Sequence, residues 1–442
     1  MAATEPLYSA EEMRAAEAGH DVDAMMRRAG TAVAEELMRR FPDARRIALH
    51  AGGGANGGDG RIAADLLQAQ GRELVDERPD VVIDALLGTG MKGAPRDEAA
   101  RAIEAINGGG APVVAVDIPS GVDASTGETA GAAVRADVTV TMHGRKVGLA
   151  VAPGRFHAGD VVVADIGLEP AETQHRLVAA EILGEVPRRS AGDNKYTSGH
   201  VVVVGGSRGM TGAAALSSRA ALRADAGYVT IAAPEESIPV LETLVLEAVK
   251  RPVEQVFDLV EKAGALAVGP GLGREPETKE LVRRLLAEAE APAVVDADAL
   301  FELEPGDWPA PRVLTPHEGE LGRLLGRDSK EIAAHRLASV QEAAGRFDCV
   351  VVLKGEDSLV AAPGRGVLVC ALGLPSLATA GTGDVLTGIT AAFLAKRMEP
   401  QRAAAAACAA QQLASRAAPQ RYGLVASDVV ESLPRALGLG AG

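Results

Sequence analysis

The chain has 442 residues, which is too long for one ordinary hydrophobic core, and at roughly 100–200 residues per domain it predicts two or three domains. Its 47% hydrophobic and 24% charged residues are typical of a globular protein, and it contains no run of about 18 apolar residues that could span a membrane. A net charge of −15 with only 2% aromatic residues argues against nucleic-acid binding, which needs basic surfaces and stacking rings.

A recurring unit runs along the chain: a short β-branched segment that ends in Asp or Gly, followed by an amphipathic segment rich in Ala and Leu. Strands that alternate with helices predict parallel sheets, whose ligands bind beyond the carboxyl ends of the strands. Residues 187–194 carry charge, Gly and Pro without periodicity. We therefore expect two α/β domains, residues 1–186 and 187–442.

Ser9-Ala10-Glu11-Glu12 predicts a capping box that opens a helix through about Ala18, and a second helix is expected from Val22 to Arg40. The first strand of the sheet then leads into Asn56-Gly57-Gly58-Asp59-Gly60, a glycine-rich turn before a helical pattern. Glycines let backbone amides converge on an anion, and a helix N-terminus adds positive potential. This turn predicts a phosphate-binding site.

Polar residues also follow the next three strands, and they are Asp84, Asp117 with Ser120, and Lys146. Each carboxylate alone could cap a helix or a turn, and Lys146 alone could be a solvated surface charge. Their convergence at one sheet edge favours a site instead. Asn56, Asp84 and Ser120 could supply oxygen ligands to a cation, while Asp117 and Lys146 would act as a base-like and an acid-like catalytic group.

The N-terminal half resembles the NAD(P)H-hydrate epimerase family, because a GxNGGDG turn, a DxxxGTG loop and a DxPSG turn occur here in that order. The resemblance implies a Rossmann-like fold, a potassium ion held by Asn56, Asp84 and Ser120, and interconversion of the R and S hydrates of nicotinamide cofactors. The substrate-binding residues implied are Asn56, Gly57, Gly58, Asp59, Gly88, Thr89, Gly90, Met91, Lys92 and Asp117. Only Arg72 to Asp80 stand where the family has a strand, a helix and a loop, so we expect a shortened fold.

Two small-residue loops follow strands of the second half, Gly205 to Ala214 and Gly269 to Gly273, and both permit close approach of a ligand. Thr315-Pro316-His317-Glu318 predicts a capping box with Pro at the first helical position. His317 would then lie at a helix N-terminus as a neutral, ligand-binding side chain, with a buried structural histidine as the alternative. Lys354 ends a further strand and is either a phosphate ligand or a surface lysine.

Asp384 opens a helix directly after Gly381, Thr382 and Gly383. An acid that only stabilises a helix dipole would not need these small residues before it. We interpret Asp384 as a general base that deprotonates a hydroxyl while the amides of residues 381–383 stabilise a phosphate in transfer.

Residues 195–437 resemble the ADP-dependent NAD(P)H-hydrate dehydratase family, a branch of the ribokinase-like fold. The resemblance rests on seven ordered blocks: KYxxGH, VVGGSxGMxGA, GPGLG, DADAL, TPHxxE, LKG and ATAGTGDVL. It implies that ADP phosphorylates the S hydrate, with Asp384 as the catalytic base, and that phosphate is then eliminated; we expect Mg²⁺ with the nucleotide. The residues implied to bind the hydrate are Ala214, Gly273, His317 and Asp384, and those implied to bind the nucleotide are Lys354, Gly355, Glu356, Asp357, Ser358, Gly381, Thr382 and Gly383.

The two halves together predict an α/β protein of two three-layer domains, a shortened Rossmann-like epimerase fold and a ribokinase-like fold. Its substrates would be NADHX and NADPHX, without nucleic-acid or membrane partners, and we expect a homo-oligomer. The cysteines at 349, 370 and 408 lack ligand-like spacing and predict buried thiols in a reducing cytoplasm. The alternative is a small-molecule kinase of the ribokinase-like fold with a non-catalytic N-terminal module.

Overall fold

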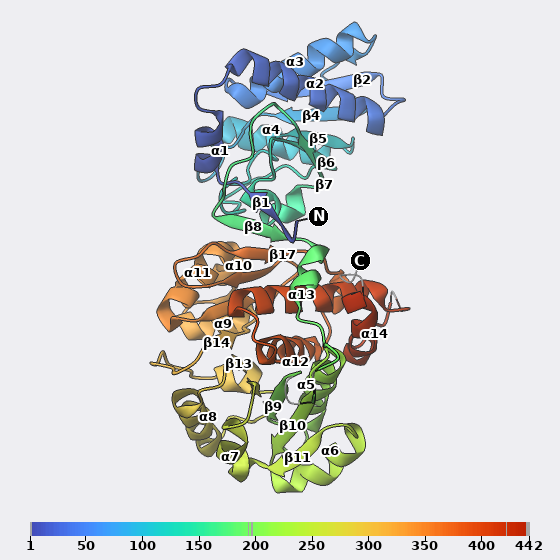
Figure 1. The fold of residues 1–442 in the computed structure, drawn as a ribbon. Coiled ribbons are helices and arrows are strands. Elements are labelled where there is room, and N and C mark those ends of the chain that lie inside the picture. The colour runs from blue at the N-terminus through green and yellow to red at the C-terminus, as the bar shows by residue number, and fades with distance from the viewer. Residues whose placement is uncertain (1, 193, 196–197, 421, 439–442) are drawn as a thin grey trace. The chain divides into compact units, whose positions relative to one another are not determined.

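The computed structural model describes residues 2–192, 194–195, 198–420 and 422–438. It divides into two compact units, and each is described by itself (Figure 1). The smaller unit is Pro6–Arg176 with Ala333–His335, and the larger unit holds Leu177–Ile332, the chain from Arg336 onward and the N-terminal residues up to Glu5. The division thus falls ten residues before 187, where we expected the domain boundary.

The smaller unit has one six-stranded, all-parallel sheet in the order β3-β2-β4-β5-β6-β7. Its strands are β2 (Arg46–Ala51), β3 (Glu73–Leu74), β4 (Val81–Ala85), β5 (Val113–Val116), β6 (Val138–Met142) and β7 (Asp160–Ala164), and its helices are α1 (Ala10–Glu17), α2 (Val22–Arg40), α3 (Ala55–Ala69) and α4 (Asp97–Gly108). The shortened connection after α3 keeps only the two-residue edge strand β3 before β4 begins.

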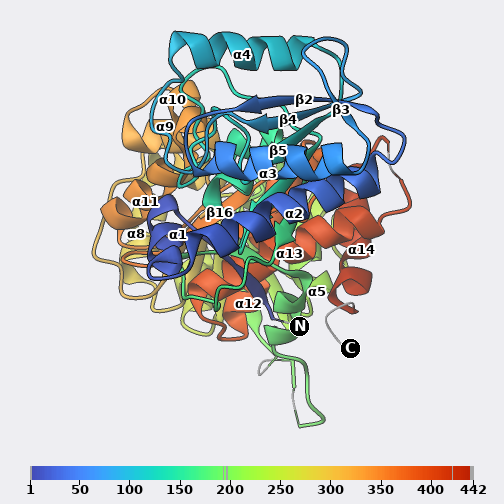
Figure 2. The same ribbon diagram turned by 90° about the horizontal axis from the view of Figure 1, so that it is seen from above.

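Helices cover both faces of this sheet, which explains why its strands read as continuous apolar runs. Side chains alternate across the pleat, so Val81 and Ile83 pack with α2 and α3 while Val82 packs with Ile103 of α4. Figure 2 shows α4 on one side of β2 and β4, with α3 on the other side. The sequence prediction of three layers is therefore confirmed for this unit.

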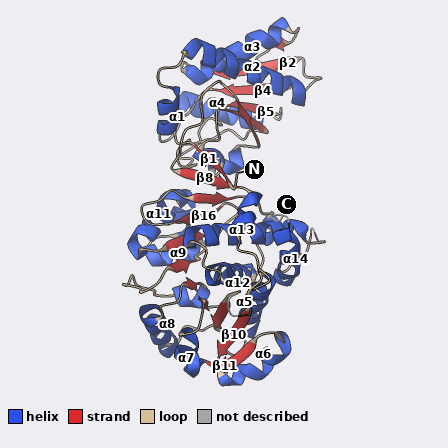
Figure 3. Cartoon of the chain, viewed as in Figure 1, coloured by secondary structure: helices blue, strands red, loops and turns tan. Residues whose placement is uncertain are grey.

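Nine strands lie wholly within the larger unit and follow one another in the sheet in the order β17-β16-β15-β14-β13-β12-β9-β10-β11. Figure 3 draws the strands in red. The strands are β9 (His200–Val204), β10 (Tyr228–Ala233), β11 (Val249–Pro252), β12 (Ala265–Val268), β13 (Ala293–Val295), β14 (Arg312–Leu314), β15 (Val350–Leu353), β16 (Ser358–Ala361) and β17 (Leu368–Cys370). Two further strands, β1 (Thr4–Leu7) and β8 (His175–Val178), are neighbours, and the division between the units falls inside both of them.

The helices of the larger unit are α5 (Thr211–Arg223), α6 (Ile238–Leu244), α7 (Val256–Val260), α8 (Pro276–Glu288), α9 (Glu318–Leu325), α10 (Ser329–Ala334), α11 (Arg336–Phe347), α12 (Thr382–Ala395), α13 (Pro400–Ala417) and α14 (Ala426–Gly438). The division between the units falls inside α10, whose last two residues belong to the smaller unit. Helix α12 is buried from Val385 to its end because it packs against α5, α13 and strands β9, β12 and β13. Its sequence is accordingly apolar on all sides. This burial fixes the position of the helix N-terminus that carries Asp384.

Two expectations for this unit need correction. The sheet is mixed, because β16 and β17 pair antiparallel, and the short connection between β15 and β16 cannot provide the crossover that a parallel pair requires. The capping box at α9 begins at His317 itself, which pairs with Glu320, so Thr315 is not the capping residue. Tyr196 and Thr197 of the KYxxGH block lie outside the described residues.

The three cysteines are free and buried, as the sequence predicted. Among the helices of the described ranges, none is both long enough and apolar enough to cross a bilayer.

Candidate functional site

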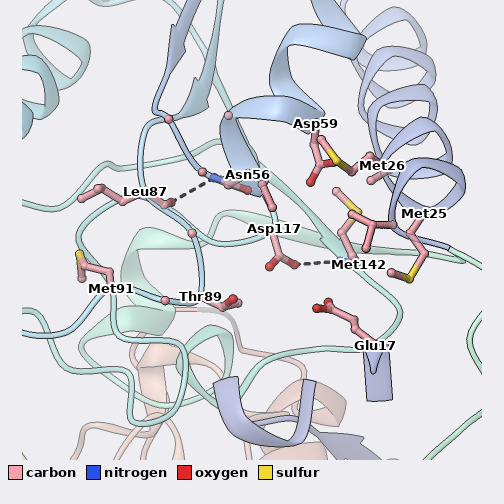
Figure 4. Close-up of a pocket in the computed structure, with 18 of the residues that line it drawn as sticks. Glu17, Met25, Met26, Asn56, Asp59, Leu87, Thr89, Met91, Asp117 and Met142 are labelled. Atoms are coloured by element: carbon pink, nitrogen blue, oxygen red, sulfur yellow. Dashed lines mark hydrogen bonds between the residues drawn. The ribbon is translucent and has the colours of Figure 1, made fainter. Parts of the chain in front are cut away.

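A cavity of about 630 Å³ opens at the carboxyl ends of the strands of the smaller unit (Figure 4). It is lined by the end of α1, the start of α2, the first turn of α3, the loop after β4 and the residue that follows β5. The predicted residues that line it are Asn56, Gly57, Asp59, Gly88, Thr89, Gly90, Met91 and Asp117. Gly58 and Lys92 are not among the lining residues, and Gly58 instead faces Met26.

The glycine-rich turn forms the first turn of α3 and does not precede it, because the helix begins at Ala55 with Gly54 as its N-cap. A Cβ at Gly57 would lie 2.0 Å from the carbonyl oxygen of Gly52, and one at Gly60 would lie 2.5 Å from Cβ of Ala85. Glycine is thus required for the close packing of α3 on the sheet. The same packing presents the free amides of the helix N-terminus to the cavity.

Asn56, Asp84 and Ser120 lie together around the backbone of Leu87. Asp84 is fully buried and accepts hydrogen bonds from the Ser120 amide (2.8 Å) and hydroxyl (2.6 Å). The Leu87 amide donates to Ser120 Oγ, and its carbonyl accepts from Asn56 Nδ2 at 3.1 Å. Burial raises the pKa of Asp84 to about 6 despite these bonds, and Asn56 Oδ1 is buried without a partner among the described residues.

Lys146 is fully buried, so the alternative of a solvated surface charge is wrong. Its ammonium donates to Asp117 Oδ1 (2.5 Å), Thr141 Oγ1 (3.0 Å) and the Met142 carbonyl (2.7 Å). Asp117 adopts a left-handed backbone (φ 64°), which turns the chain at the end of β5. Its Oδ1 also accepts from the Met142 amide, whereas its Oδ2 accepts no bond from the described residues and is available to a ligand.

Sequence reasoning missed Glu17 and the methionines Met25 and Met26 as parts of this cavity. Glu17 ends α1, where a glutamate is usually a solvated surface residue, and the sequence carries no signal for its position. Asp59 was expected to bind substrate, but its environment was not foreseen. Burial, followed by the charges of Asp117 and Glu17, raises the pKa of Asp59 to about 7.

In the larger unit, Asp384 is the third residue of α12, after Gly381 with its left-handed φ of 87°. A Cβ at Gly383 would lie 3.4 Å from Lys354 Nζ, which places this lysine against the start of the helix. Burial raises the pKa of Asp384 to about 7, and the nearby carboxylate of Asp296 contributes, while Lys354 acts in the opposite direction. A carboxylate with this pKa can accept a proton near neutral pH.

Lys354 is held by two carboxylates and is not a free surface lysine. Its Nζ lies 2.7 Å from Asp296 Oδ1 and 3.5 Å from Glu320 Oε2. Burial alone would raise the pKa of Asp296, but the charge of Lys354 and hydrogen bonds from Lys354 and Thr387 outweigh it and hold the pKa below its ordinary value. Asp296 belongs to the DADAL block, but the sequence analysis gave it no role in the site. Its position directly after β13 could have indicated that it lies at the ligand-binding edge of the sheet.

His317 is half-exposed (56% of its side chain), so the alternative of a buried structural histidine is wrong. Its Nδ1 accepts hydrogen bonds from the amides of Gly319 (3.0 Å) and Glu320 (3.4 Å). A ring nitrogen that accepts N–H groups carries no proton, so Nε2 is the donor, and it lies 3.5 Å from Oε1 of Glu320. This geometry suits a neutral histidine that donates a hydrogen bond to a ligand.

The remaining predicted residues fall into exposed and buried groups. Gly355 and Glu356 are exposed in the connection between β15 and β16, while Asp357 is 1% exposed and ion-paired with Arg336 at 3.0 Å. Ser358 Oγ donates to the Gly355 carbonyl (3.0 Å), and Thr382 Oγ1 donates to the carbonyls of Leu377 and Thr379. The Ala214 side chain is fully buried, and the Gly273 amide donates to Asp298 Oδ2 (3.1 Å).

Within the described ranges, no three His, Cys, Asp or Glu side chains are grouped so that they could hold a metal ion.

Comparison with protein families identifies both units. Residues 201–435 match the NAD(P)H-hydrate dehydratase family, and residues 22–77 and 68–148 match the family described as YjeF-related protein N-terminus. The two N-terminal matches overlap at the short connection between α3 and β4, where the fold is shortened.

Whole-chain relatives and a solved structure agree with these families. Proteins called "Bifunctional NAD(P)H-hydrate repair enzyme Nnr" are 36% identical in Pyrobaculum aerophilum, over 93% of both chains, and in Moorella thermoacetica, over 93% of this chain and 92% of the relative. The relative from Escherichia coli is 34% identical, over 93% of this chain and 88% of its own. A Bacillus subtilis ADP/ATP-dependent NAD(P)H-hydrate dehydratase, crystallised with ATP and Mg²⁺, is similar over 59% of this chain and 97% of its own (28% identity, TM-score 0.55).

Proposed function

The chain belongs to the family of bifunctional NAD(P)H-hydrate repair enzymes, and on this basis we propose how its two sites divide the reaction. The enzyme is an NAD(P)H-hydrate dehydratase and epimerase that repairs NADHX and NADPHX. We assign epimerisation of the R and S hydrates to the cavity of the smaller unit and dehydration of the S hydrate to the Asp384 site. The observation that carries the second assignment is the half-buried Asp384, with its raised pKa, at the N-terminus of α12.

In the dehydratase, Asp384 would accept the proton of the C6 hydroxyl while that oxygen attacks the terminal phosphorus of the nucleotide. The amides of residues 381–383 would stabilise the charge on the transferring phosphoryl group. The C6–O bond then breaks, phosphate leaves, and loss of a proton from the neighbouring carbon restores the reduced nicotinamide. The pKa values of the two neighbouring carboxylates support Asp384 as the base. The pKa of Asp296 is lowered and that of Asp384 is raised, so only Asp384 is suited to exchange a proton near neutral pH.

We propose ADP as the phosphoryl donor, so that the products are NAD(P)H, AMP and phosphate. Lys354 lies against Gly383, where its charge would meet a nucleotide phosphate, and Gly355, Glu356 and His317 are exposed for ligand contact. We expect Mg²⁺ to enter with the nucleotide phosphates and to be held mainly by them.

In the epimerase, the free amides of Asn56 and Gly57 in the first turn of α3 would bind the substrate pyrophosphate. Asp117 would act as the catalytic base through Oδ2, and buried Lys146 would hold the Asp117 carboxylate in place through Oδ1. Thr89, Gly90 and Met91 line the same cavity and would contact the rest of the dinucleotide.

We propose that Asn56, Asp84 and Ser120 hold K⁺, with the Leu87 carbonyl as a neighbouring oxygen. The unpartnered Asn56 Oδ1 and a fully buried Asp84 carboxylate fit a cation, which would neutralise Asp84 and order the substrate-binding loop. Replacing KCl by choline chloride should therefore lower the melting temperature of the smaller unit and its epimerase rate. Asp84→Asn should remove this salt-specific difference in melting temperature. The control variant Asp65→Asn, at an exposed position, should keep it. If wild type and Asp84→Asn respond identically to the two salts, the proposed K⁺ site is wrong.

One assay tests the function as a whole, by following absorbance at 340 nm as the enzyme and ADP act on mixed R and S NADHX. We expect full recovery of NADH at an enzyme-dependent rate, with equimolar AMP and phosphate. Recovery of the S fraction alone would leave the dehydratase intact and favour the non-catalytic N-terminal module. A stable phosphoester without free phosphate would instead support a small-molecule kinase. A parallel reaction with ATP compares the two donors directly.

We also retain a homo-oligomer and a cytoplasmic location as proposals. Val240, Leu244 and Leu246 around α6 are exposed by 47%, 44% and 80%, and such a group of apolar side chains supports an interface between copies. Three buried free thiols support a reducing compartment. Light scattering coupled to size-exclusion chromatography would test the first proposal, and cell fractionation the second.

A further inference from the structure

Glu17 lines the epimerase cavity from the last residue of α1, and no prediction or family motif assigned it a role. In Figure 4 its carboxylate points toward that of Asp117, beside Thr89. Asp117 follows β5 and Asp59 is the fifth residue of α3, so three elements bring three carboxylates to one cavity. Lys146 is the neighbouring cation, and it is already paired with Asp117.

This arrangement has no evident structural benefit. Glu17 is half-buried, and its side chain has no hydrogen bond or ion pair with any residue in the described part of the chain. Burial first, and then the negative charge of Asp117, raises the pKa of Glu17, while Lys146 acts in the opposite direction. Asp59 Oδ1 is likewise buried without a partner. Unpaired, partly desolvated carboxylates that face one another destabilise a fold, and such groups concentrate at functional sites.

Epimerisation at C6 needs more than one group that can move a proton. The hydroxyl leaves as water when an acid protonates it and the lone pair of the ring nitrogen forms a C=N bond. Water then adds to the other face of that bond and gives its proton to a base. The atoms balance without any co-reactant, and the acid and the base must exchange roles when the opposite epimer reacts.

We propose that Glu17 is a second catalytic acid–base group of the epimerase, acting with Asp117 on the hydroxyl and on the water at C6. This proposal rests on the proposed epimerase function of the cavity. Asp117 is paired with the Lys146 ammonium through Oδ1 and presents its other oxygen to the cavity, which suits the base. Glu17 has no cation of its own, and its raised pKa suits the acid. Asp59 would be a positioning residue near the substrate.

The test is Glu17→Gln in the full chain, with R-to-S conversion followed by NMR and without nucleotide. We expect kcat to fall about 10²-fold or more with little change in KM, because a lost proton transfer affects the reaction and not the binding. Glu17→Asp should recover part of the rate, and the pH–rate profile of Glu17→Gln should lose its alkaline limb. Glu11→Gln, in the exposed first turn of the same helix, is the matched control and should keep the wild-type rate.

Stability provides a second readout that a merely structural role would not produce. The pKa of Glu17 is higher in the folded protein than its ordinary value of 4.5, so its ionised form disfavours folding at neutral pH, and this penalty disappears in acid, where Glu17 is protonated in both states. Glu17→Gln should therefore raise the melting temperature at pH 8 and not at pH 4. An unchanged epimerase rate in Glu17→Gln overturns the proposal. A lower melting temperature of Glu17→Gln that accounts for its loss of epimerase activity overturns it as well. If the wild type itself does not epimerise the hydrates, the proposed function of the cavity is wrong instead.

Discussion

Asp384→Asn is expected to reduce dehydration of the S hydrate by about 10³-fold, while epimerisation continues at the wild-type rate. Asparagine has nearly the same shape but cannot accept the hydroxyl proton, and loss of a positioned base costs about 10²–10⁴-fold. The fold should tolerate the change, because burial and the charge of Asp296 already oppose ionisation of Asp384. The measurement is single-turnover formation of reduced nicotinamide at 340 nm with saturating ADP.

Two observations distinguish this result from general damage. Asp258→Asn, at an exposed position of α7 in the same unit, should keep full activity. In the wild type, kcat/KM for the hydrate should fall about tenfold per pH unit below about 7, because the raised pKa of Asp384 leaves it protonated there. A dehydratase rate that is constant from pH 5 to 8, or substantial activity in Asp384→Asn, would mean that another group takes the proton.

The rule that ligands bind beyond the carboxyl ends of parallel strands found most of both sites from sequence. Asp117 comes directly after strand β5, and Asp384 lies at the start of α12 behind a glycine turn. Both positions therefore follow from the local sequence pattern. The same rule would have placed Asp296, which follows β13 and holds Lys354. The long apolar runs predicted buried parallel strands, and in the smaller unit helices do cover both faces of the sheet.

What the sequence did not reveal are contacts between segments that are far apart in the chain. Whether Lys146 is solvated or buried depends on Asp117 and on the end of β6, and no local pattern records that pairing. Glu17 reaches the cavity only because α1 ends beside it, and its sequence neighbours read as an ordinary exposed helix end. The capping role of His317 was misplaced because Pro316 and Glu318 fit a capping box two residues earlier, while the actual partner is Glu320.

Asp117→Asn is expected to abolish epimerisation, with a loss of about 10²–10⁴-fold, while dehydration of the pure S hydrate is unchanged. The variant removes the proposed base and also leaves the fully buried Lys146 without its counter-charge. Breaking a buried ion pair in this way costs about 3–5 kcal/mol of stability, so the melting temperature of the smaller unit should fall as well. Activity is measured by NMR of the R and S hydrates, and unfolding by differential scanning calorimetry.

Because unfolding could by itself explain an inactive Asp117→Asn, the decisive variant is the double substitution Asp117→Asn/Lys146→Met. Methionine removes the orphaned charge from a site lined by Thr141 and the Met142 backbone, and it should recover much of the lost stability. Epimerisation should nevertheless remain absent, because the base is still missing. If the stabilised double variant epimerises as the wild type does, Asp117 and Lys146 are a structural pair and the proton must be transferred by another carboxylate of the cavity.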